Sequence, residues 1–329
     1  MPAQIRRRLL PNTDLNLSVL CLGTGPFGGE ISEDETFRLL DAYAERGGNF
    51  LDTAEVYSNW LPGEPSRSET RIGRWLRSRR LSGKIFVATK GGNPRLTSPT
   101  VSRLSPEEIR HDLDGSLDRL GLDTIPLYYL HRDDPARPVG EIIDTLAEAV
   151  AAGKIRYIAC SNWTHQRIAA AQDYAAAHGR PAFVADQPRW SLARVNPESQ
   201  SDPTMVEMND DLYAYHLKTN LPAVPYSSQA QGFFSGAYGR AIAHPAARVG
   251  EKVLSYYGNE PNFSRLDRVT QLARQLNRPA THVALAFLLS QPFPVFPIIG
   301  PSSLPHLEDS LAAHDLALTT DQVRWLDRG

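Results

Sequence analysis

The strongest constraint on this chain is a regular alternation between short apolar runs and longer segments with helical periodicity. Eight apolar runs occur in order, at residues 18–23, 49–53, 84–90, 125–131, 154–160, 182–187, 222–227 and 294–300. Runs that lack a polar alternation are typical of parallel strands buried on both faces. Because right-handed helical crossovers join such strands, eight units predict an α/β fold of the (β/α)₈ barrel type.

An open doubly wound sheet is the main rival to a closed barrel. Such a sheet usually carries a glycine-rich turn with the spacing G-x-G-x-x-G directly after its first strand. The stretch CLGTGPFGG at residues 21–29 departs from that spacing, and no acidic partner follows at the expected distance. We therefore interpret this stretch as a loop and favour the TIM barrel.

The helical segments begin and end with recognisable signals. Glycines 47 and 121 follow two of the segments, as expected at helix C-termini. One segment places Ile72, Trp75 and Leu76 on a common apolar face. Serine followed three residues later by glutamate, the spacing of a capping box, marks three helix starts: Ser32–Glu35, Ser66–Glu69 and Ser105–Glu108.

The chain outside the barrel strands is also informative. Residues 6–17 contain Asn12, Thr13 and Asp14, which suit a turn, so we expect a β-hairpin that closes the bottom of the barrel. The barrel would span about residues 18–313, and residues 1–329 would form a single domain. Residues 193–209 and 236–262 interrupt the alternation and are rich in Pro, Gly and polar residues, which predicts long loops on the C-terminal face.

The composition narrows the classes of partner. The chain is 41% hydrophobic and 22% charged, with a net charge of −2, so no basic surface points to nucleic acid. No apolar run reaches the length of a membrane span, and the N-terminus lacks the apolar core of a signal peptide. The two cysteines, Cys21 and Cys160, lie in apolar runs and are expected to be buried thiols of a cytoplasmic protein.

Ionisable side chains gather where three successive strands end. Asp52 ends the second apolar run, Lys90 ends the third and His131 ends the fourth, while Tyr57 follows Asp52 by five residues. Each residue alone has a plain structural explanation as a turn former, a core residue or a solvated charge. Because the C-terminal ends of barrel strands meet at one mouth, we expect the four side chains to lie together.

These four residue types suit carbonyl reduction. A tyrosine hydroxyl has a pKa of about 10, and a nearby ammonium favours its phenolate form. Lys90 could supply that ammonium, Asp52 could hold it in place, and His131 could orient the substrate oxygen. Tyr57 would then act as the general acid that protonates an alkoxide, or as the base in the reverse reaction. No side chain supplies a hydride, so a nicotinamide cofactor is expected.

The residues and motifs together resemble the aldo-keto reductase superfamily. FLDTAEVY at residues 50–57 is similar to the Asp-Thr-Ala-x-x-Tyr signature of that superfamily. GKIRYIACSN, PYSSQAQGFFSG and PIIGPSSLPHLEDSL resemble three further motifs in the same order along the chain. The resemblance extends from Val19 to Leu311, and it implies a TIM barrel with Asp52, Tyr57, Lys90 and His131 as its catalytic tetrad.

The resemblance also implies positions for the cofactor. Backbone N–H groups from Ser227 to Gly232 are implied to meet its pyrophosphate. The implied contacts are Gly23 and Thr24 below the ribose, Ser161, Asn162 and Gln187 at the carboxamide, Tyr226 against the ring, Ser227, Gln229 and Gly232 at the pyrophosphate, and Gly300, Ser302, Ser303, His306 and Ser310 around the adenosine.

The cofactor is expected to be NADPH, with NADH as the alternative. The preference for NADPH rests on the habit of the family alone. A 2′-phosphate favours cationic donors, whereas the implied positions here carry Gly300, Ser302, Ser303 and His306. Ser310 stands where the family usually has Asn, and Gln229 stands where Leu is common.

The substrate is expected to be a small aldehyde or ketone, or the corresponding alcohol. Aromatic residues follow the motifs, and we interpret Phe27, Trp60 and Trp163 as candidates for the substrate pocket. A sugar or sugar-derived carbonyl fits such a pocket because aromatic rings also suit pyranose faces. The sequence leaves open the substrate itself, the physiological direction and the oligomeric state.

Two other functions are also compatible with the sequence. A metal-dependent barrel hydrolase or lyase could use His131, Asp133, Asp134 and Asp52 as ligands. Adjacent acids in HRDDP point to different sides, so salt bridges or helix caps are the simpler interpretation for Asp133 and Asp134, and no metal is expected. A cofactor-binding regulatory subunit on the same fold could also keep the tetrad, since fold alone does not determine function.

Overall fold

The structure is a computed structural model that describes residues 4–200, 202–240 and 248–329. Its centre is a curled parallel sheet with the strand order β8-β7-β6-β5-β4-β3-β9. The strands are β3 (Cys21–Gly23), β4 (Phe50–Asp52), β5 (Phe86–Gly91), β6 (Ile125–Leu130), β7 (Ile155–Ser161), β8 (Asp186–Gln187) and β9 (Ile298–Ile299). β3 pairs with both β4 and β9, so the first and last parallel strands along the chain are neighbours in the sheet.

The barrel closes through a short strand-like segment between β8 and β9. Ala223 forms parallel bridges to Asp186 on one side and Val295 on the other. Pro222 and Pro225 flank this segment, and proline has no N–H to donate to a ladder. The predicted run at 222–227 therefore occupies the place of a barrel strand while making only isolated bridges, and the predicted (β/α)₈ barrel is confirmed.

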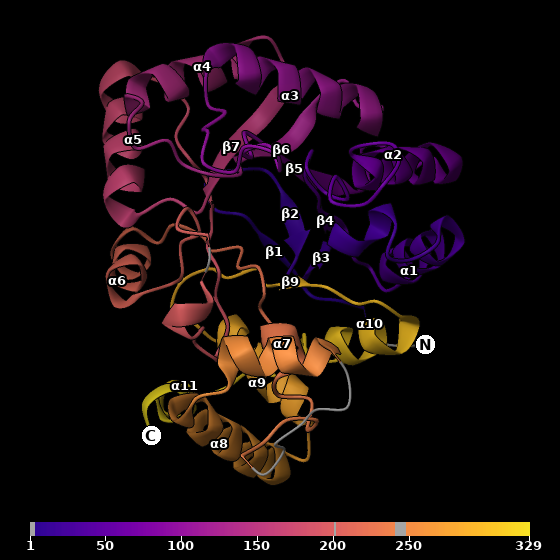
Figure 1. Cartoon of the computed structure of the whole chain (residues 1–329), viewed down its shortest axis with the longest axis vertical. Coiled ribbons are helices and arrows are strands. Elements are labelled where there is room, and N and C mark those ends of the chain that lie inside the picture. Colours follow the sequence, from indigo (N-terminus) through magenta and orange to yellow (C-terminus); the bar gives the residue numbers. More distant parts are fainter. Residues whose placement is uncertain (1–3, 201, 241–247) are drawn as a thin grey trace.

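Helices cover the outside of the strands (Figure 1). They pack their apolar faces inward, as the buried Ile72, Trp75 and Leu76 of α2 illustrate. The helices are α1 (Glu33–Glu45), α2 (Arg67–Arg79), α3 (Pro106–Leu120), α4 (Val139–Ala151), α5 (His165–His178), α6 (Asp210–Thr219), α7 (Arg248–Tyr257), α8 (Glu260–Leu276), α9 (Ala280–Leu289), α10 (Leu304–Leu311) and α11 (Thr320–Arg328).

Two of the three expected N-caps form as predicted. The side chain of Ser32 accepts a hydrogen bond from the N–H of Glu35, and that of Ser105 accepts one from Glu108. Ser66 does not cap α2, because it adopts a left-handed conformation with φ 54° and makes no capping hydrogen bond. Glu69 is instead completely buried, where it accepts hydrogen bonds from Thr89 and Arg119.

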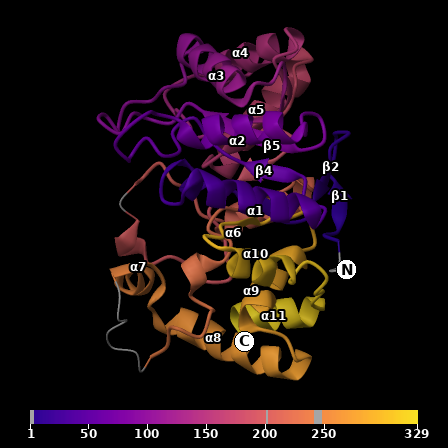
Figure 2. The same cartoon turned by 90° about the vertical axis from the view of Figure 1, so that its right-hand side faces the viewer.

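The N-terminal hairpin closes one end of the barrel, as predicted. β1 (Arg7–Leu9) pairs antiparallel with β2 (Asn16–Ser18), and the turn between them has Asn12 at φ 61°. Leu10, Leu15 and Leu17 are fully buried in the cluster that fills the barrel interior. Figure 2 shows the hairpin at one end of the barrel and α7 at the opposite end.

Residues 236–262, which interrupt the strand–helix alternation for the second time, contain more helix than predicted, because they include α7 and the start of α8. Val253 and Tyr257 of α7 lie four residues apart and are both buried, which gives the helix one apolar face. The two interruptions also bind each other. The N–H of Asn196 donates to the carbonyl of Tyr256 at 2.7 Å, and Ser199 donates to Ser255 at 2.8 Å. Residues 201 and 241–247 lie outside the described residues.

The two cysteines are free and buried, as expected. Among the described residues, no helix has both the length and the apolar character needed to cross a membrane.

A prediction follows from the close approach of α2 and α3. A Cβ on Gly73 would lie 2.2 Å from the backbone oxygen of Arg119, which cannot move without displacing α3. We expect Gly73→Ala to lower the free energy of unfolding by about 1–3 kcal/mol because the two helices must separate. Urea unfolding measures this change. Gly239→Ala is the control, since no described residue beyond its own chain neighbours lies within 4 Å of its Cβ position; equal stability of both variants would contradict the packing.

Candidate active site

The four predicted catalytic side chains lie together at the C-terminal ends of neighbouring strands. Asp52 ends β4, Lys90 lies near the end of β5, and His131 directly follows β6. β4 and β5 pair with Asp52 opposite Ala88, so Lys90 projects from the same face two residues further on. Strand register therefore brings an acid and an amine from distant parts of the sequence into contact.

Lys90 is the centre of this cluster. Its Nζ donates to Asp52 Oδ2 at 2.7 Å, to the carbonyl of Thr53 at 2.7 Å and to the hydroxyl oxygen of Tyr57 at 3.2 Å. An ammonium has three hydrogens, so all of them are used. Lys90 is fully buried, and Asp52 raises its pKa against the opposing effect of burial. The amine thus remains positively charged beneath Tyr57.

The hydroxyl of Tyr57 is a proton donor over the neutral range. Burial raises its pKa above the ordinary value of 10.0, while the charge of Lys90 acts in the opposite direction. The sequence argument considered only the lowering by Lys90, so the net direction differs from it. A tyrosine of this kind stays protonated near neutrality, and Lys90 still stabilises its phenolate once the proton leaves.

His131 presents a neutral imidazole next to Tyr57. Burial first, and then the charges of Arg132 and Lys90, lower its pKa well below 6.5. The ring centroids of His131 and Tyr57 are 5.9 Å apart, with the rings at 72° to each other. The Nδ1 atom of His131 is buried and has no hydrogen-bond partner among the described residues. A neutral ring with free hydrogen-bonding capacity is suited to orient a polar ligand atom.

A chain of hydrogen bonds joins the tetrad to residues expected at the nicotinamide. Gln187 Nε2 donates to Asp52 Oδ1 at 2.9 Å, and Ser161 Oγ donates to the carbonyl of Gln187 at 2.8 Å. Asn162 Nδ2 donates to the carbonyl of His131 at 3.1 Å, and Asn162 Oδ1 accepts from the hydroxyl of Tyr226 at 2.8 Å. The protein thus engages both ends of the Asn162 side chain.

Two neighbouring segments have the shape of an anion-binding region. Ser227, Ala230, Gln231 and Gly232 all have positive φ, between 48° and 84°, which curls the backbone so that amides can converge. Gln229 Nε2 donates to Ser310 Oγ at 2.9 Å and ties this turn to α10.

The start of α10 carries several of the residues expected around the adenosine, and the turn at 227–232 contacts the other end of this helix through Ser310. Ser303 caps the helix, and the side chains of Ser302 and His306 lie 3.3 Å apart. A Cβ at Gly300 would meet no atom of residues 4–200, 202–240 or 248–329 within 4 Å, its own chain neighbours aside. The residues expected around the adenosine therefore do share one region of the molecule.

The residues expected below the ribose are packed against the strands. A Cβ on Gly23 would lie 2.7 Å from Cγ2 of Ile298, so only glycine fits where β3 and β9 approach. Thr24 is buried, and its hydroxyl donates to the carbonyl of Asp52 at 2.8 Å. Both residues hold the ends of neighbouring strands in place.

The three aromatic candidates for the substrate pocket differ in position. Trp60 is 46% exposed and its ring lies 6.2 Å from that of Tyr57. Phe27 and Trp163 are completely buried in two separate core clusters. Trp163 is held there by the carbonyl of Arg132, which accepts its Nε1–H at 3.1 Å. Phe27 and Trp163 thus offer no surface to a substrate in this structure, because both rings are completely buried against core side chains.

Arg132 is a site residue that the sequence argument considered only as part of HRDDP. Its Nε donates to Thr204 at 3.0 Å and its Nη2 contacts Asp202 at 3.3 Å, so residues of the first interruption hold it beside His131. Its position directly after the strand-end histidine is the signal that could have identified it. The N–H of Val206 also donates to Asn162 Oδ1 at 3.1 Å, so the interruption contacts the site twice.

The acids considered as metal ligands have other partners. Arg167 donates to both carboxylate oxygens of Asp133, at 2.9 and 3.0 Å. Asp134 caps the following turn through the N–H of Ala136 and lies 3.7 Å from Arg137. The predicted salt bridges of these two residues are confirmed, whereas neither residue caps a helix.

Several known proteins are similar to this chain over nearly all of its length. It is 27% identical to norsolorinic acid reductase B of Dothistroma septosporum, covering 98% of this chain and 80% of that protein. It is 30% identical to the uncharacterized oxidoreductase YrpG of Bacillus subtilis, covering 97% and 94% of the two proteins. It is 28% identical to the aldo-keto reductase ausK of Aspergillus calidoustus, covering 98% and 81%.

The family comparison agrees with the fold and the strand-end cluster. The sequence matches the aldo/keto reductase family over residues 19–328, which includes every barrel strand and the tetrad. This chain therefore belongs to the aldo/keto reductase family, whose members are oxidoreductases that act on carbonyl compounds.

Proposed function

We propose that the protein reduces an aldehyde or ketone to an alcohol, or catalyses the reverse reaction, with NADPH as cofactor and Tyr57 as the general acid or base. The single observation that carries the proposal is the buried ammonium of Lys90, held between Asp52 and the hydroxyl of Tyr57. This contact places a protonated phenol and a stabilising charge at one point on the floor of the barrel mouth.

The residues would divide the work as follows. A bound reduced nicotinamide supplies the hydride. Tyr57 gives its hydroxyl proton to the oxygen of the carbonyl as negative charge develops there, and Lys90 stabilises the phenolate that remains. His131 orients the same oxygen by a hydrogen bond from its neutral ring. In the oxidative direction, the phenolate of Tyr57 removes the hydroxyl proton of the alcohol.

The cofactor would lie along the regions described above. Ser161, Asn162 and Gln187 lie nearest the nicotinamide carboxamide in this proposal, with Tyr226 against the ring and Gly23 and Thr24 below the ribose. Contact of Asn162 with the carboxamide requires it to exchange one of its protein hydrogen bonds for one to the ligand. The turn at 227–232 would hold the pyrophosphate, while residues 300–303 with His306 and Ser310 would surround the adenosine.

The substrate we propose is a small carbonyl compound with an apolar or sugar-like body. The exposed ring of Trp60 beside Tyr57 is the observation that supports this class. An aromatic face at the reacting end contributes contact area to an apolar group and to one face of a pyranose alike.

Removal of the Tyr57 hydroxyl tests the acid directly. With NADPH and an aldehyde such as benzaldehyde, we expect Tyr57→Phe to lower kcat about 10²–10⁴-fold, because no other group donates the proton. Tyr157→Phe is the matched control, since that hydroxyl contacts Asp14 of the hairpin turn. A Tyr57→Phe rate within about threefold of the parent rate would reject the assignment. Tight cofactor binding without turnover of any carbonyl would favour a regulatory subunit.

The pH dependence tests the protonation states. Because the pKa of Tyr57 lies above 10.0 and that of His131 lies well below 6.5, both groups stay uncharged between about pH 7 and pH 9. We expect kcat/KM for the aldehyde to stay level over that range. A fall in rate with rising pH within that interval would show that Tyr57 loses its proton there and would contradict the raised pKa.

Cofactor choice is tested by titration of the protein fluorescence. We expect NADPH to bind about tenfold more tightly than NADH, because the N–H groups at the start of α10, with Ser302 and His306, would meet the 2′-phosphate. Equal or tighter binding of NADH would contradict the preference for NADPH.

A further inference from the structure

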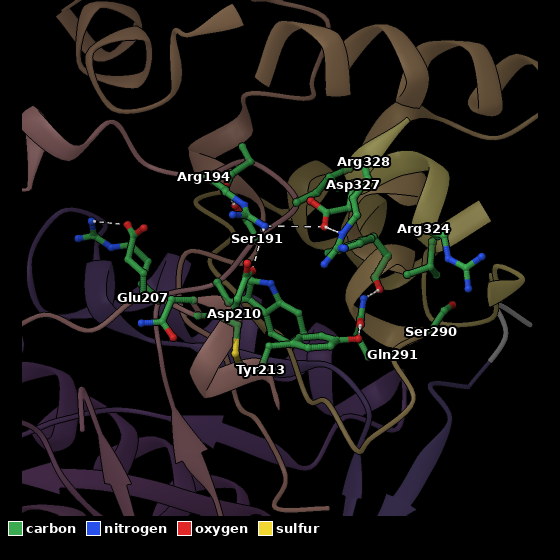
Figure 3. Close-up of a pocket in the computed structure, with 18 of the residues that line it drawn as sticks. Ser191, Arg194, Glu207, Asp210, Tyr213, Ser290, Gln291, Arg324, Asp327 and Arg328 are labelled. Carbon is green, nitrogen blue, oxygen red and sulfur yellow. Dashed lines mark hydrogen bonds and ion pairs between the residues drawn. The ribbon is translucent and has the colours of Figure 1, made fainter. Parts of the chain in front are cut away.

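A cavity of about 400 Å³ lies outside the tetrad region, where residues 189–195 run past α6, α9 and α11. Figure 3 shows this pocket and the side chains that line it. Asp52, Tyr57, Lys90 and His131 are not among the described residues that form its wall. Its volume falls within the range of pockets that bind small organic molecules.

One part of the cavity wall is aromatic and apolar. Trp190 and Phe287 are only 8% and 6% exposed, so the pocket reaches their edges. Trp190 is fixed by stacking on Phe293, with ring centroids 5.9 Å apart and an angle of 24°. Tyr213 is fixed by its hydroxyl, which donates to Gln291 at 3.0 Å. This wall is a rigid platform for an apolar body.

On the opposite part of the wall, the positive charges of the arginines outnumber the negative charges of the acids that could neutralise them. Asp327 Oδ1 already accepts from Arg265 at 2.9 Å. Its second oxygen has two further guanidinium groups nearby, from Arg194 at 3.8 Å and Arg328 at 3.7 Å. These two distances are too long for hydrogen bonds, and the side chains of Arg194 and Arg328 are 56% and 74% exposed, so an anion that binds here would replace water at their donors. Figure 3 shows Arg194, Asp327 and Arg328 gathered on one side of the pocket, with Tyr213 and Gln291 on the other.

The remaining acids of the wall leave this excess in place. Asp210 lies 3.6 Å from Arg194 but is 79% exposed, so water screens the pair. Glu207 lies 3.6 Å from Arg189 on another part of the wall, so these two charges offset each other, although the distance is too long for a hydrogen bond. The cavity thus combines an apolar platform with two water-exposed arginines whose side chains make no hydrogen bond to another residue that the structure describes.

We propose that this cavity binds an organic carboxylate with an aromatic or other apolar body. The carboxylate would accept hydrogen bonds from Arg194 and Arg328, whose planar guanidinium groups match its two oxygens. The body would lie against Trp190, Tyr213 and Phe287. The site is separate from the tetrad, so the ligand is neither the substrate nor the cofactor of the proposed reaction.

The position of the cavity connects it to Tyr226. The N–H of Trp190 donates to the carbonyl of Tyr226 at 3.2 Å, and the guanidinium of Arg189 lies 5.8 Å from the centre of the Tyr226 ring. Both Arg189 and Trp190 line the cavity. A ligand that shifts them would change the affinity for NADPH, and this consequence rests on the proposed function because Tyr226 is proposed to contact the nicotinamide.

The binding test uses naphthalene-2-carboxylate and its neutral carboxamide as probes of the full-length protein by isothermal titration calorimetry. We expect the carboxylate to bind about tenfold more tightly than the amide, because only the anion uses the arginine donors. Arg194→Ala should weaken the carboxylate about tenfold and leave the amide unchanged. Arg38→Ala, an exposed arginine of α1 that pairs with Glu35, is the matched control and should change neither.

Three results would overturn the site: no saturable binding of the carboxylate up to about 1 mM, equal binding of the amide, or unaltered carboxylate binding in Arg194→Ala. The last result would place the probe elsewhere, for example against Tyr57 and His131.

The connection to Tyr226 has its own readout. The carboxylate should change the Kd of NADPH, and NADPH should change the Kd of the carboxylate by the same factor. An unchanged Kd for NADPH at saturating probe would overturn the connection. A protein that binds the probe but not NADPH would fail the proposed function while retaining the site.

Discussion

The contact between Lys90 and Asp52 is the interaction on which the site depends. Burying one charge alone costs several kcal/mol, whereas a pair with satisfied hydrogen bonds can be tolerated in an interior. Here the carboxylate is satisfied on both oxygens, by Lys90 and by Gln187, and the ammonium is satisfied by three acceptors. The pair is therefore held in one geometry. The third hydrogen of Lys90 points to the hydroxyl oxygen of Tyr57, so the charge of the ammonium acts on that hydroxyl.

The barrel is what makes this pair possible. Parallel pairing places Asp52 beside Ala88, and the two-residue period of a strand then directs Lys90 toward the same interior. The next pairings continue the pattern, since Leu130 lies opposite Cys160 and Ser161 lies opposite Gln187. Side chains from four strand ends, together with the backbone carbonyl of His131 at a fifth, consequently form one hydrogen-bonded cluster. Asp52 and Gln187, which bond directly within it, are 135 residues apart in the sequence.

The residues that follow an apolar run could be predicted from the sequence, because a strand end fixes both their position and their direction. For this reason the sequence was sufficient to predict the barrel and to place the tetrad residues at strand ends. The burial of Phe27 and Trp163 could not be predicted, since a position near a motif does not tell whether an aromatic ring faces the pocket or the core. The direction of the Tyr57 pKa depends on burial, which only the folded structure reveals. The helix α7 was missed because Gly250 lies within it and the surrounding residues 236–262 are rich in glycine and proline, although Val253 and Tyr257 share one buried face.

The most direct test of the account is a measurement of the Tyr57 pKa by NMR of ¹³C-labelled tyrosine. Tyr57→Phe assigns the signal, and the comparison is between the parent and the double variant Lys90→Met with Asp52→Asn, which removes the pair without leaving one buried charge. The lowering effect of Lys90 exceeds the raising effect of Asp52, so the account predicts that Tyr57 ionises at a higher pH in the double variant. An equal or lower pKa in that variant would show that Lys90 does not act on the phenol.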